Sequence, residues 1–300
     1  MTERDVTAPG AAGSGATGEG AAGAGLTGEG AAGSGATGEG AAGAGLTGEG
    51  AAGAGLTGEG AAGPDVTGAD PARSDAVGPD VAVPESVGLP FASGREADVY
   101  ALGDGRVLRR YRHGGDAAPE AAVMAYAGKH GFPVPEVFRA GGADLVMERL
   151  DGPTLAQALL AGDLTVDRGA TILADLLRQL HDLPPMRDGE TLVHLDVHPE
   201  NVVLSQRGPV LIDWRNAGDG PADLDTALAA LILAQVAVGA IDHELGSHAG
   251  ELLDLFLERA SGDPVRLLPE AVEIRRGQPT MSPEEIEQLS VAAARVRGVK

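Results

Sequence analysis

Residues 192–214 combine two apolar, β-prone runs with a polar loop between them. Asp196, Asn201 and Asp213 therefore fall at the ends of predicted strands. Phosphoryl transfer needs a carboxylate that orients and deprotonates a hydroxyl, together with oxygen ligands for Mg²⁺ beside the phosphates. The spacing thus predicts Asp196 as the catalytic carboxylate, and Asn201 and Asp213 as ligands of Mg²⁺. The alternative is a hairpin whose acidic residues only cap turns.

The local pattern is His194-x-Asp196-x-His198-Pro199-x-Asn201, followed by Ile212-Asp213-Trp214. It resembles the catalytic and metal loops of the aminoglycoside phosphotransferase and choline kinase-like family. The resemblance implies an α+β, two-lobed protein kinase-like fold, with a small antiparallel-sheet lobe, a larger helical lobe and ATP between them. It also implies transfer of the γ-phosphoryl group of ATP, with Mg²⁺, to a hydroxyl of a small aminoglycoside-, choline- or amino-alcohol-like molecule.

The two histidines of this loop have supporting roles in the same resemblance. His194 matches a position that holds the loop through hydrogen bonds, and His198 precedes a proline in a turn. The pattern His-x-Asp-x-His also raises the alternative of a zinc site, because alternating residues of a strand share a face. No third His or Cys stands nearby, so Mg²⁺ is the better interpretation.

The resemblance implies a nucleotide site in residues 94–120. Gly94 would lie at the lip of a strand pair that covers the phosphates. Arg109 occupies the place of the usual phosphate-binding lysine, and the chain has only two lysines, neither of them in this strand. Arg110 is the alternative to Arg109. Glu120 would pair with the strand cation, or would only favour the first turn of a helix.

Two further segments complete the resemblance. The strand predicted at 143–152 would be the hinge between the lobes, with main-chain groups around Glu148 to Leu150 facing the adenine edge. Asp225, with Asp223 as second choice, would cap the next helix and brace the catalytic loop.

The remaining periodicity predicts a hairpin over 94–111 and helices over 117–129, 153–161 and 166–183. Three or four helices are expected after residue 227, with breaks near 239, 262–264 and 277–283. The expected domains are a tail and linker over 1–85, a nucleotide-binding lobe over 86–150, and a helical lobe with the catalytic and metal loops over 151–300.

Residues 11–60 are five near-copies of a Gly/Ala-rich unit of ten residues. Each unit has four glycines and at most one leucine, so it loses much backbone entropy on ordering and has little to bury. Stacked repeats would need an apolar face, and collagen would need glycine at every third position. The repeats therefore predict a disordered, acidic tail.

Composition limits the partners. The formal charge of −22 disfavours nucleic-acid binding, and suits a cationic small molecule as well as it suits solubility. No cysteine is present, the N-terminus lacks the apolar core of a signal peptide, and the apolar run 227–240 is shorter than a membrane span. We expect a cytoplasmic protein without membrane partners, and the oligomeric state stays open.

A rival hypothesis is a catalytically silent kinase-like module that binds nucleotide and recruits partners through its disordered tail. The missing strand lysine favours it. The presence of Asp196, Asn201 and Asp213 favours catalysis. Phosphorylation of proteins is disfavoured, because no activation segment is recognisable between Asp213 and Asp225.

Overall fold

The structure is a computed structural model that describes residues 88–94, 96–279 and 281–298. The predicted repeat tail and linker lie outside the described residues, so the expectation of disorder there stays a prediction.

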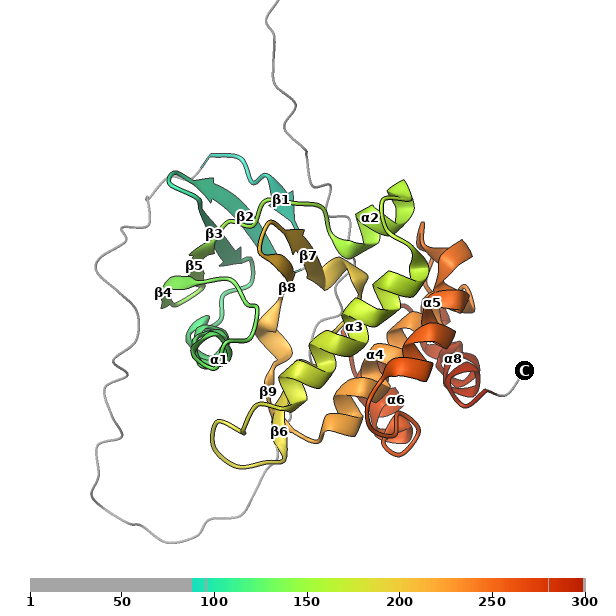
Figure 1. Cartoon of the computed structure of the whole chain (residues 1–300). Helices are drawn as coiled ribbons and strands as arrows, with labels where there is room; N and C mark the ends of the chain where they lie inside the picture. The colour runs from blue at the N-terminus through green and yellow to red at the C-terminus, as the bar shows by residue number, and fades with distance from the viewer. Residues whose placement is uncertain (1–87, 95, 280, 299–300) are drawn as a thin grey trace, which may run out of the picture. The chain divides into compact units, whose positions relative to one another are not determined.

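A five-stranded antiparallel sheet forms the first half of the described chain, with strand order β1-β2-β3-β5-β4 (Figure 1). Its elements are β1 (Ala92–Ser93), β2 (Ala97–Leu102), β3 (Arg106–Tyr111), α1 (Ala118–Lys129), β4 (Val137–Gly141) and β5 (Asp144–Glu148). The predicted hairpin is confirmed as β2 and β3, whose turn holds Asp104 at φ 59° and Gly105 at φ 69°. Helix α1 is confirmed as well, with a proline in its first turn.

The second half is mainly helical and also contains two short antiparallel ladders (Figure 1). Its helices are α2 (Leu155–Ala161), α3 (Val166–His181), α4 (Ala222–Ala237), α5 (Gly246–Arg259), α6 (Leu268–Arg276), α7 (Pro283–Glu287) and α8 (Leu289–Val296). The ladders pair β6 (Thr191–Val193) with β9 (Gly218–Gly220), and β7 (Val202–Ser205) with β8 (Gly208–Leu211). The 3₁₀ turns η1 (Pro199–Asn201) and η2 (Trp214–Asn216) follow the two strands that carry the polar loops. The predicted two-lobed α+β architecture is confirmed.

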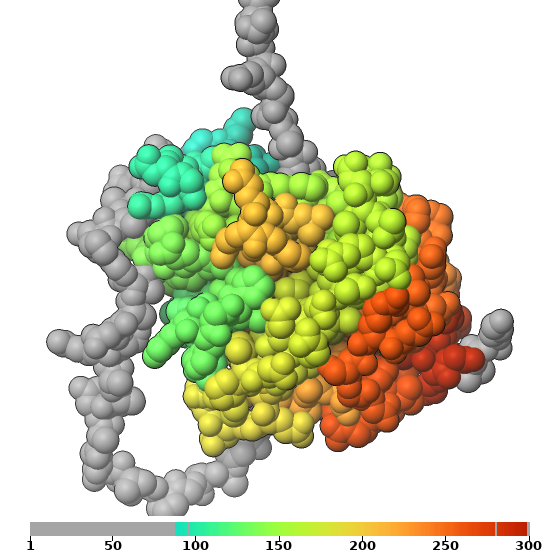
Figure 2. Space-filling model, in the orientation of Figure 1, coloured from blue at the N-terminus to red at the C-terminus, as the bar shows by residue number. Residues whose placement is uncertain are grey.

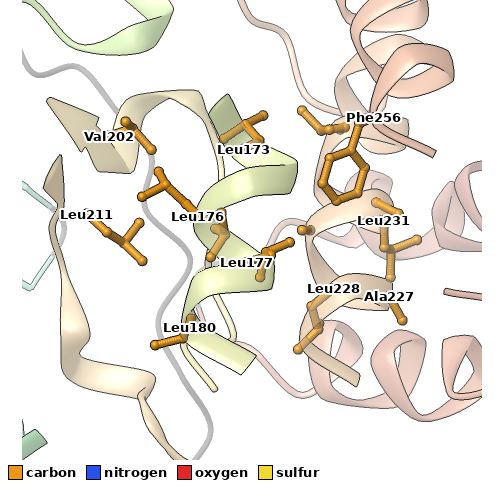
Figure 3. Close-up of a cluster of buried hydrophobic side chains, with 14 of the residues drawn as sticks. Leu173, Leu176, Leu177, Leu180, Val202, Leu211, Ala227, Leu228, Leu231 and Phe256 are labelled. Atoms are coloured by element: carbon orange, nitrogen blue, oxygen red, sulfur yellow. The ribbon is translucent and has the colours of Figure 1, made fainter. Parts of the chain in front are cut away.

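The core is built around α3, whose apolar residues recur at helical spacing on one stripe. Figure 3 shows these leucines between Val202 and Leu211 of the β7–β8 ladder on one side, and Leu228 and Phe256 of α4 and α5 on the other. Helix α4 is apolar nearly all round and is buried along most of its length. The loops carrying the predicted site residues are therefore anchored to the most buried helices of this half.

The helices after residue 227 differ from the prediction. The breaks near 239, 262–264 and 277–283 are confirmed, but α4 begins earlier, at Ala222, and the last segment consists of two helices that meet at Gln288. Gln288 has φ −83° and ψ −7°, and neither glycine nor proline marks the break. The sequence therefore gave no signal for it. None of the described helices has the length and apolar character needed to span a membrane.

Candidate active site

The loop that carries Asp196 is held by a buried carboxylate. Leu195 has φ 65°, an uncommon conformation for a residue with a branched side chain. Asp225 of α4 accepts hydrogen bonds from the backbone N–H groups of Leu195 (2.7 Å) and His194 (2.9 Å). Its Oδ2 also lies 3.0 Å from His181 Nε2. The predicted bracing contact is therefore present.

The predicted capping role of Asp225 is wrong. Pro221 precedes α4, and Asp225 lies inside the first turn of the helix. Asp223, the second choice, faces another loop, where it pairs with Arg266 and accepts from the backbone N–H of Asp263 at 3.0 Å.

Asp196 is 2% exposed, and no described residue donates a hydrogen bond to its Oδ1. Asn201 Nδ2 donates to the backbone oxygen of Asp196 at 2.9 Å and to its Oδ2 at 3.3 Å. Burial, reinforced by the negative charge of Asp213, raises the pKa of Asp196 to about 8. Its Oδ1 lies 3.9 Å from His198 Nε2, too far for a hydrogen bond. A buried carboxyl with one oxygen lacking a hydrogen-bond partner points to an active group more than to a stabilising one.

Asn201 and Asp213 offer oxygen atoms of the kind Mg²⁺ binds. The amide nitrogen of Asn201 is used by Asp196, which leaves its Oδ1 as the atom able to act as a ligand. Asp213 follows β8 with φ 65° and is half-buried. Burial alone would raise the pKa of Asp213, but Arg109 outweighs this and keeps it below its usual range, so the side chain is a carboxylate. The two residues fit a magnesium site.

Arg109 joins the sheet lobe to the metal loop. Its Nη1 lies 2.7 Å from Glu120 Oε1 of α1, and its Nη2 lies 2.6 Å from Asp213 Oδ1. Tyr111 also donates a hydrogen bond to Glu120. Arg110 instead pairs with Asp144 at 2.7 Å, and its side chain is 34% exposed. Of the two arginines, the structure places Arg109 in the interior, next to the predicted partner Glu120.

The histidines of the catalytic loop are both buried. The ring of His194 donates from Nε2 to the backbone oxygen of Ile212 at 3.1 Å, and packs edge-on against Trp214. This bond ties the catalytic loop to the metal loop. Burial lowers the pKa of His194, and it lowers the pKa of His198 to about 4. Both rings are therefore uncharged near neutral pH, in line with supporting roles.

The hinge differs from the prediction in its hydrogen bonds. The backbone N–H of Glu148 donates to Glu136 O, and that of Arg149 donates to Gly105 O, each at 2.8 Å. Leu150 N–H makes no hydrogen bond within the described part of the chain. Of the main-chain donors expected to face adenine, only that of Leu150 is therefore left.

The side chain of Glu148 contacts the helical half of the chain. Arg207, in the turn between β7 and β8, reaches Glu148 Oε2 at 2.6 Å and donates to Val134 O at 3.1 Å. Figure 2 shows the β7–β8 hairpin, in amber, on the surface beside residues of both halves. The sequence carried no signal for this contact, because a turn arginine is ordinarily a surface charge.

Gly94 lies in the bend between β1 and β2, where its N–H donates to Ala97 O at 2.9 Å. A Cβ added at Gly94 would stand 3.7 Å from the same oxygen, an ordinary contact. Packing of the described chain therefore does not require glycine here, and its predicted place at the phosphate lip stays a prediction.

A cavity of about 290 Å³ lies beside Asp196. Its walls come from η1, α4, the loop after α4, α5 and α6. Arg275 of α6 and His243 of the loop also line it, and sequence reasoning missed both. Only their position in the folded chain distinguishes them from the other arginines and histidines of this half of the chain.

Comparison with known proteins identifies the family. The model of the phosphotransferase enzyme family APH matches residues 87–191 and 186–255, more than half of the chain. The chain belongs to this family. The predicted membership is confirmed, and with it the general assignment as a phosphotransferase.

Three solved structures are similar to this phosphotransferase at low identity. Amicoumacin kinase hAmiN, in complex with AMP-PNP, Ca²⁺ and Ami, is 17% identical, with 69% of this chain and 86% of that chain covered and a TM-score of 0.39. A choline/ethanolamine kinase family protein from Mesorhizobium loti is 14% identical, with coverages of 67% and 90% and a TM-score of 0.37. A thermostable mutant of aminoglycoside phosphotransferase APH(4)-Ia, in a ternary complex with AMP-PNP and hygromycin B, is 13% identical, with coverages of 70% and 92% and a TM-score of 0.47. No curated protein matches the chain.

Proposed function

We propose that this phosphotransferase moves the γ-phosphoryl group of ATP to a hydroxyl of a small molecule, with Mg²⁺. The observation that carries the proposal is the convergence of two sets of contacts. Arg109 joins Glu120 to Asp213, and Asn201 holds Asp196 a few residues away on the neighbouring loop. The buried, partly unsatisfied Asp196 also lines a cavity large enough for a small molecule.

Each residue has one task in this proposal. Asp196 orients the acceptor hydroxyl and, in its deprotonated form, receives the proton of that hydroxyl. The hydroxyl oxygen forms the new bond to the γ-phosphorus, while the bond from that phosphorus to the bridging oxygen breaks and ADP leaves. Asn201 and Asp213 would hold Mg²⁺, which supplies positive charge against the phosphate oxygens when bound. Arg109, positioned by Glu120 through Nη1, would contact the phosphates through the donors that Glu120 does not hold.

The sheet lobe would bind the rest of the nucleotide. Residues 86–150 would form the nucleotide-binding lobe, with Gly94 over the phosphates and the Leu150 N–H at the adenine edge. Residues 151–300 would form the helical lobe that carries the catalytic and metal loops. His194, His198 and Asp225 would position the catalytic loop without touching the substrates.

The second candidate is a silent nucleotide-binding module. The observation that favours it is Arg109 at the position of the usual lysine, bound directly to Asp213. A catalyst must release Asp213 from this ion pair when nucleotide and metal bind. A silent module could keep the pair closed.

Measurement of Mg²⁺-dependent ADP formation by the full chain, across a panel of hydroxylated acceptors, separates the two candidates. We expect turnover that disappears in Asp213→Ala, while thermal melting shows an intact fold. Asp175→Ala, which changes a half-exposed acid of α3, should keep wild-type turnover. Full activity in Asp213→Ala would refute the proposed function. So would a wild type that binds ATP but forms no ADP with any acceptor of the panel.

A further inference from the structure

The cavity beside Asp196 is small for a ligand pocket. Its volume of about 290 Å³ lies at the lower end of the range of roughly 300–1,000 Å³ that is common for small-molecule sites. A compact molecule fits it. A ligand of several linked sugar rings would have to extend outside.

Aliphatic side chains make up much of the cavity lining. Ile232 and Val236 of α4 face it from one side, and Leu245 and Leu252 at and within the next helix face it from another. These aliphatic side chains favour an apolar body in the ligand, because polar groups placed against them would lack partners.

A guanidinium lies inside the cavity. Arg275 is 3% exposed and lines the same space as Asp196. Its Nε donates to Gln235 Oε1 at 2.9 Å, and its Nη1 donates to Gln278 Oε1 at 2.8 Å. These two amides fix the plane of the guanidinium. Its positive charge faces the same cavity as the carboxyl of Asp196.

Two further acidic residues, Glu200 and Asp242, line the cavity. Asp242 is exposed, and Glu200 is bound to His243 Nε2 at 3.0 Å. Leu245 N–H donates to His243 Nδ1, so Nε2 carries the hydrogen that is donated to Glu200. The cavity thus has both the carboxyl of Asp196 and the guanidinium of Arg275 in its lining, together with aliphatic side chains.

We infer that the acceptor is a compact hydroxy acid with a hydrocarbon body, whose hydroxyl lies at Asp196 and whose carboxylate lies against Arg275. This inference rests on the proposed function and narrows it to a substrate class. The carboxylate stays unchanged in the reaction, because the new phosphorus–oxygen bond forms at the hydroxyl. A cationic acceptor in the same orientation, with its hydroxyl at Asp196 and its ammonium against Arg275, would bring two positive charges together, and like charges repel.

The test compares three kinds of probe of equal length: ω-hydroxy acids of four to eight carbons, the matching diols, and the matching amino alcohols. Isothermal titration calorimetry with the full chain measures the binding of each. For the best length, we expect the hydroxy acid to bind at least about tenfold more tightly than the diol or the amino alcohol, because a charge-assisted pair with arginine is added.

Variants then test whether Arg275 is responsible for the tighter binding of hydroxy acids. In Arg275→Gln the advantage of the hydroxy acid should fall to within about threefold, a loss that corresponds to removal of one charged partner. Arg276→Gln is the matched control, since Arg276 is the next residue of α6, is half exposed, and pairs with Glu273. It should keep the preference. Thermal melting checks the fold, and the wild-type comparison of probes decides the matter if Arg275→Gln does not fold.

Equal or tighter binding of the amino alcohols, no binding of any probe, or an unchanged preference in Arg275→Gln would overturn the inference. The outcomes also separate it from the proposed function. Transfer to diols or amino alcohols without a carboxylate preference overturns the substrate class alone. Selective binding of hydroxy acids without any Mg²⁺-dependent transfer overturns the proposed function, while the ligand class stands.

Discussion

Replacement of Asp225 by alanine should strongly destabilise this phosphotransferase. The side chain is fully buried in the first turn of α4. It accepts from Leu195 N at 2.7 Å and His194 N at 2.9 Å, and contacts His181 Nε2 at 3.0 Å. Alanine removes all three contacts and leaves two backbone donors buried without partners.

The expected loss can be worked from these contacts. Hydrogen bonds to a charged group contribute about 1.5–3 kcal/mol each, but their sum overstates the net effect because burial of the carboxylate itself costs free energy. Removal of one partner from a buried charged pair typically costs about 3–5 kcal/mol. We therefore expect the free energy of unfolding to fall by about 3–5 kcal/mol, a large part of the 5–15 kcal/mol usual for a domain. Leu195 at φ 65° would also lose its support, so turnover should fall further than stability alone explains.

Urea unfolding of the full chain, followed by tryptophan fluorescence of the buried Trp214, measures the effect. Asp223→Ala is the matched control, because Asp223 lies two residues earlier on the same helix and pairs with the half-exposed Arg266. It should cost about 1 kcal/mol or less. A cost under 1 kcal/mol for Asp225→Ala, or one equal to that of the control, would refute the reasoning.

The pH dependence supplies an independent check. Burial alone would raise the pKa of Asp225, but the hydrogen bonds from His181 and the His194 backbone outweigh it and lower the pKa. A carboxyl with a depressed folded pKa contributes stability above its unfolded pKa of 3.8, and that stability is lost as pH falls through the folded value. The difference between wild type and Asp225→Ala should be constant from about pH 5 to 7 and shrink in stronger acid.

Three further predictions test other parts of the molecule. Arg109→Ala should raise the KM for ATP at least about tenfold, while Arg110→Ala, at a half-exposed ion pair, should change it by less than about twofold; equal effects would remove Arg109 from the phosphate site. Asp196→Asn should abolish transfer yet stabilise the nucleotide-free protein at alkaline pH. The pKa of Asp196 is raised from 3.8 to about 8, so the free energy of unfolding of the wild type falls as pH rises between those values, by up to about 1.4 kcal/mol per pH unit. If the advantage of Asp196→Asn over the wild type in urea unfolding is no larger at pH 8 than at pH 5, this reasoning is wrong. Gly152→Ala should lower the free energy of unfolding by about 2–4 kcal/mol, because Gly152 has φ 143° and an added Cβ would stand 2.2 Å from a backbone oxygen of β7. Gly162→Ala is the control, and it should cost about 1 kcal/mol because Gly162 has φ 74° but open space around it. Thermal unfolding of both variants gives the comparison.

Local patterns in the sequence were sufficient to predict the family and the architecture of an antiparallel sheet followed by helices. Asp196, Asn201 and Asp213 lie within eighteen positions of one another, so strand ends and turns of the same segment bring them together. The apolar stripe of α3 and the hairpin of β2 and β3 likewise depend on periodicity and turn residues that are readable along the chain.

Where the sequence left two residues open for one role, only the tertiary structure showed which of them makes the contact. Arg109 and Arg110 are adjacent and chemically equal, and only the packing of α1 and the metal loop against β3 directs Arg109 to Glu120 and Asp213. The predicted bracing role of Asp225 holds, but its predicted capping role fails, because the folded helix α4 begins at Ala222, before Asp225. Arg275 shares a cavity with Asp196 although many residues separate them.

The sequence by itself thus determined which chemical groups lie at the ends of strands and in the turns of this phosphotransferase, because strands, turns and helices are set mainly by neighbours along the chain. The folded structure alone decided which of those groups are buried, which are paired and which face one cavity. These properties depend on distances between residues far apart in sequence, and such distances exist only once the apolar faces of the helices and the sheet have packed together.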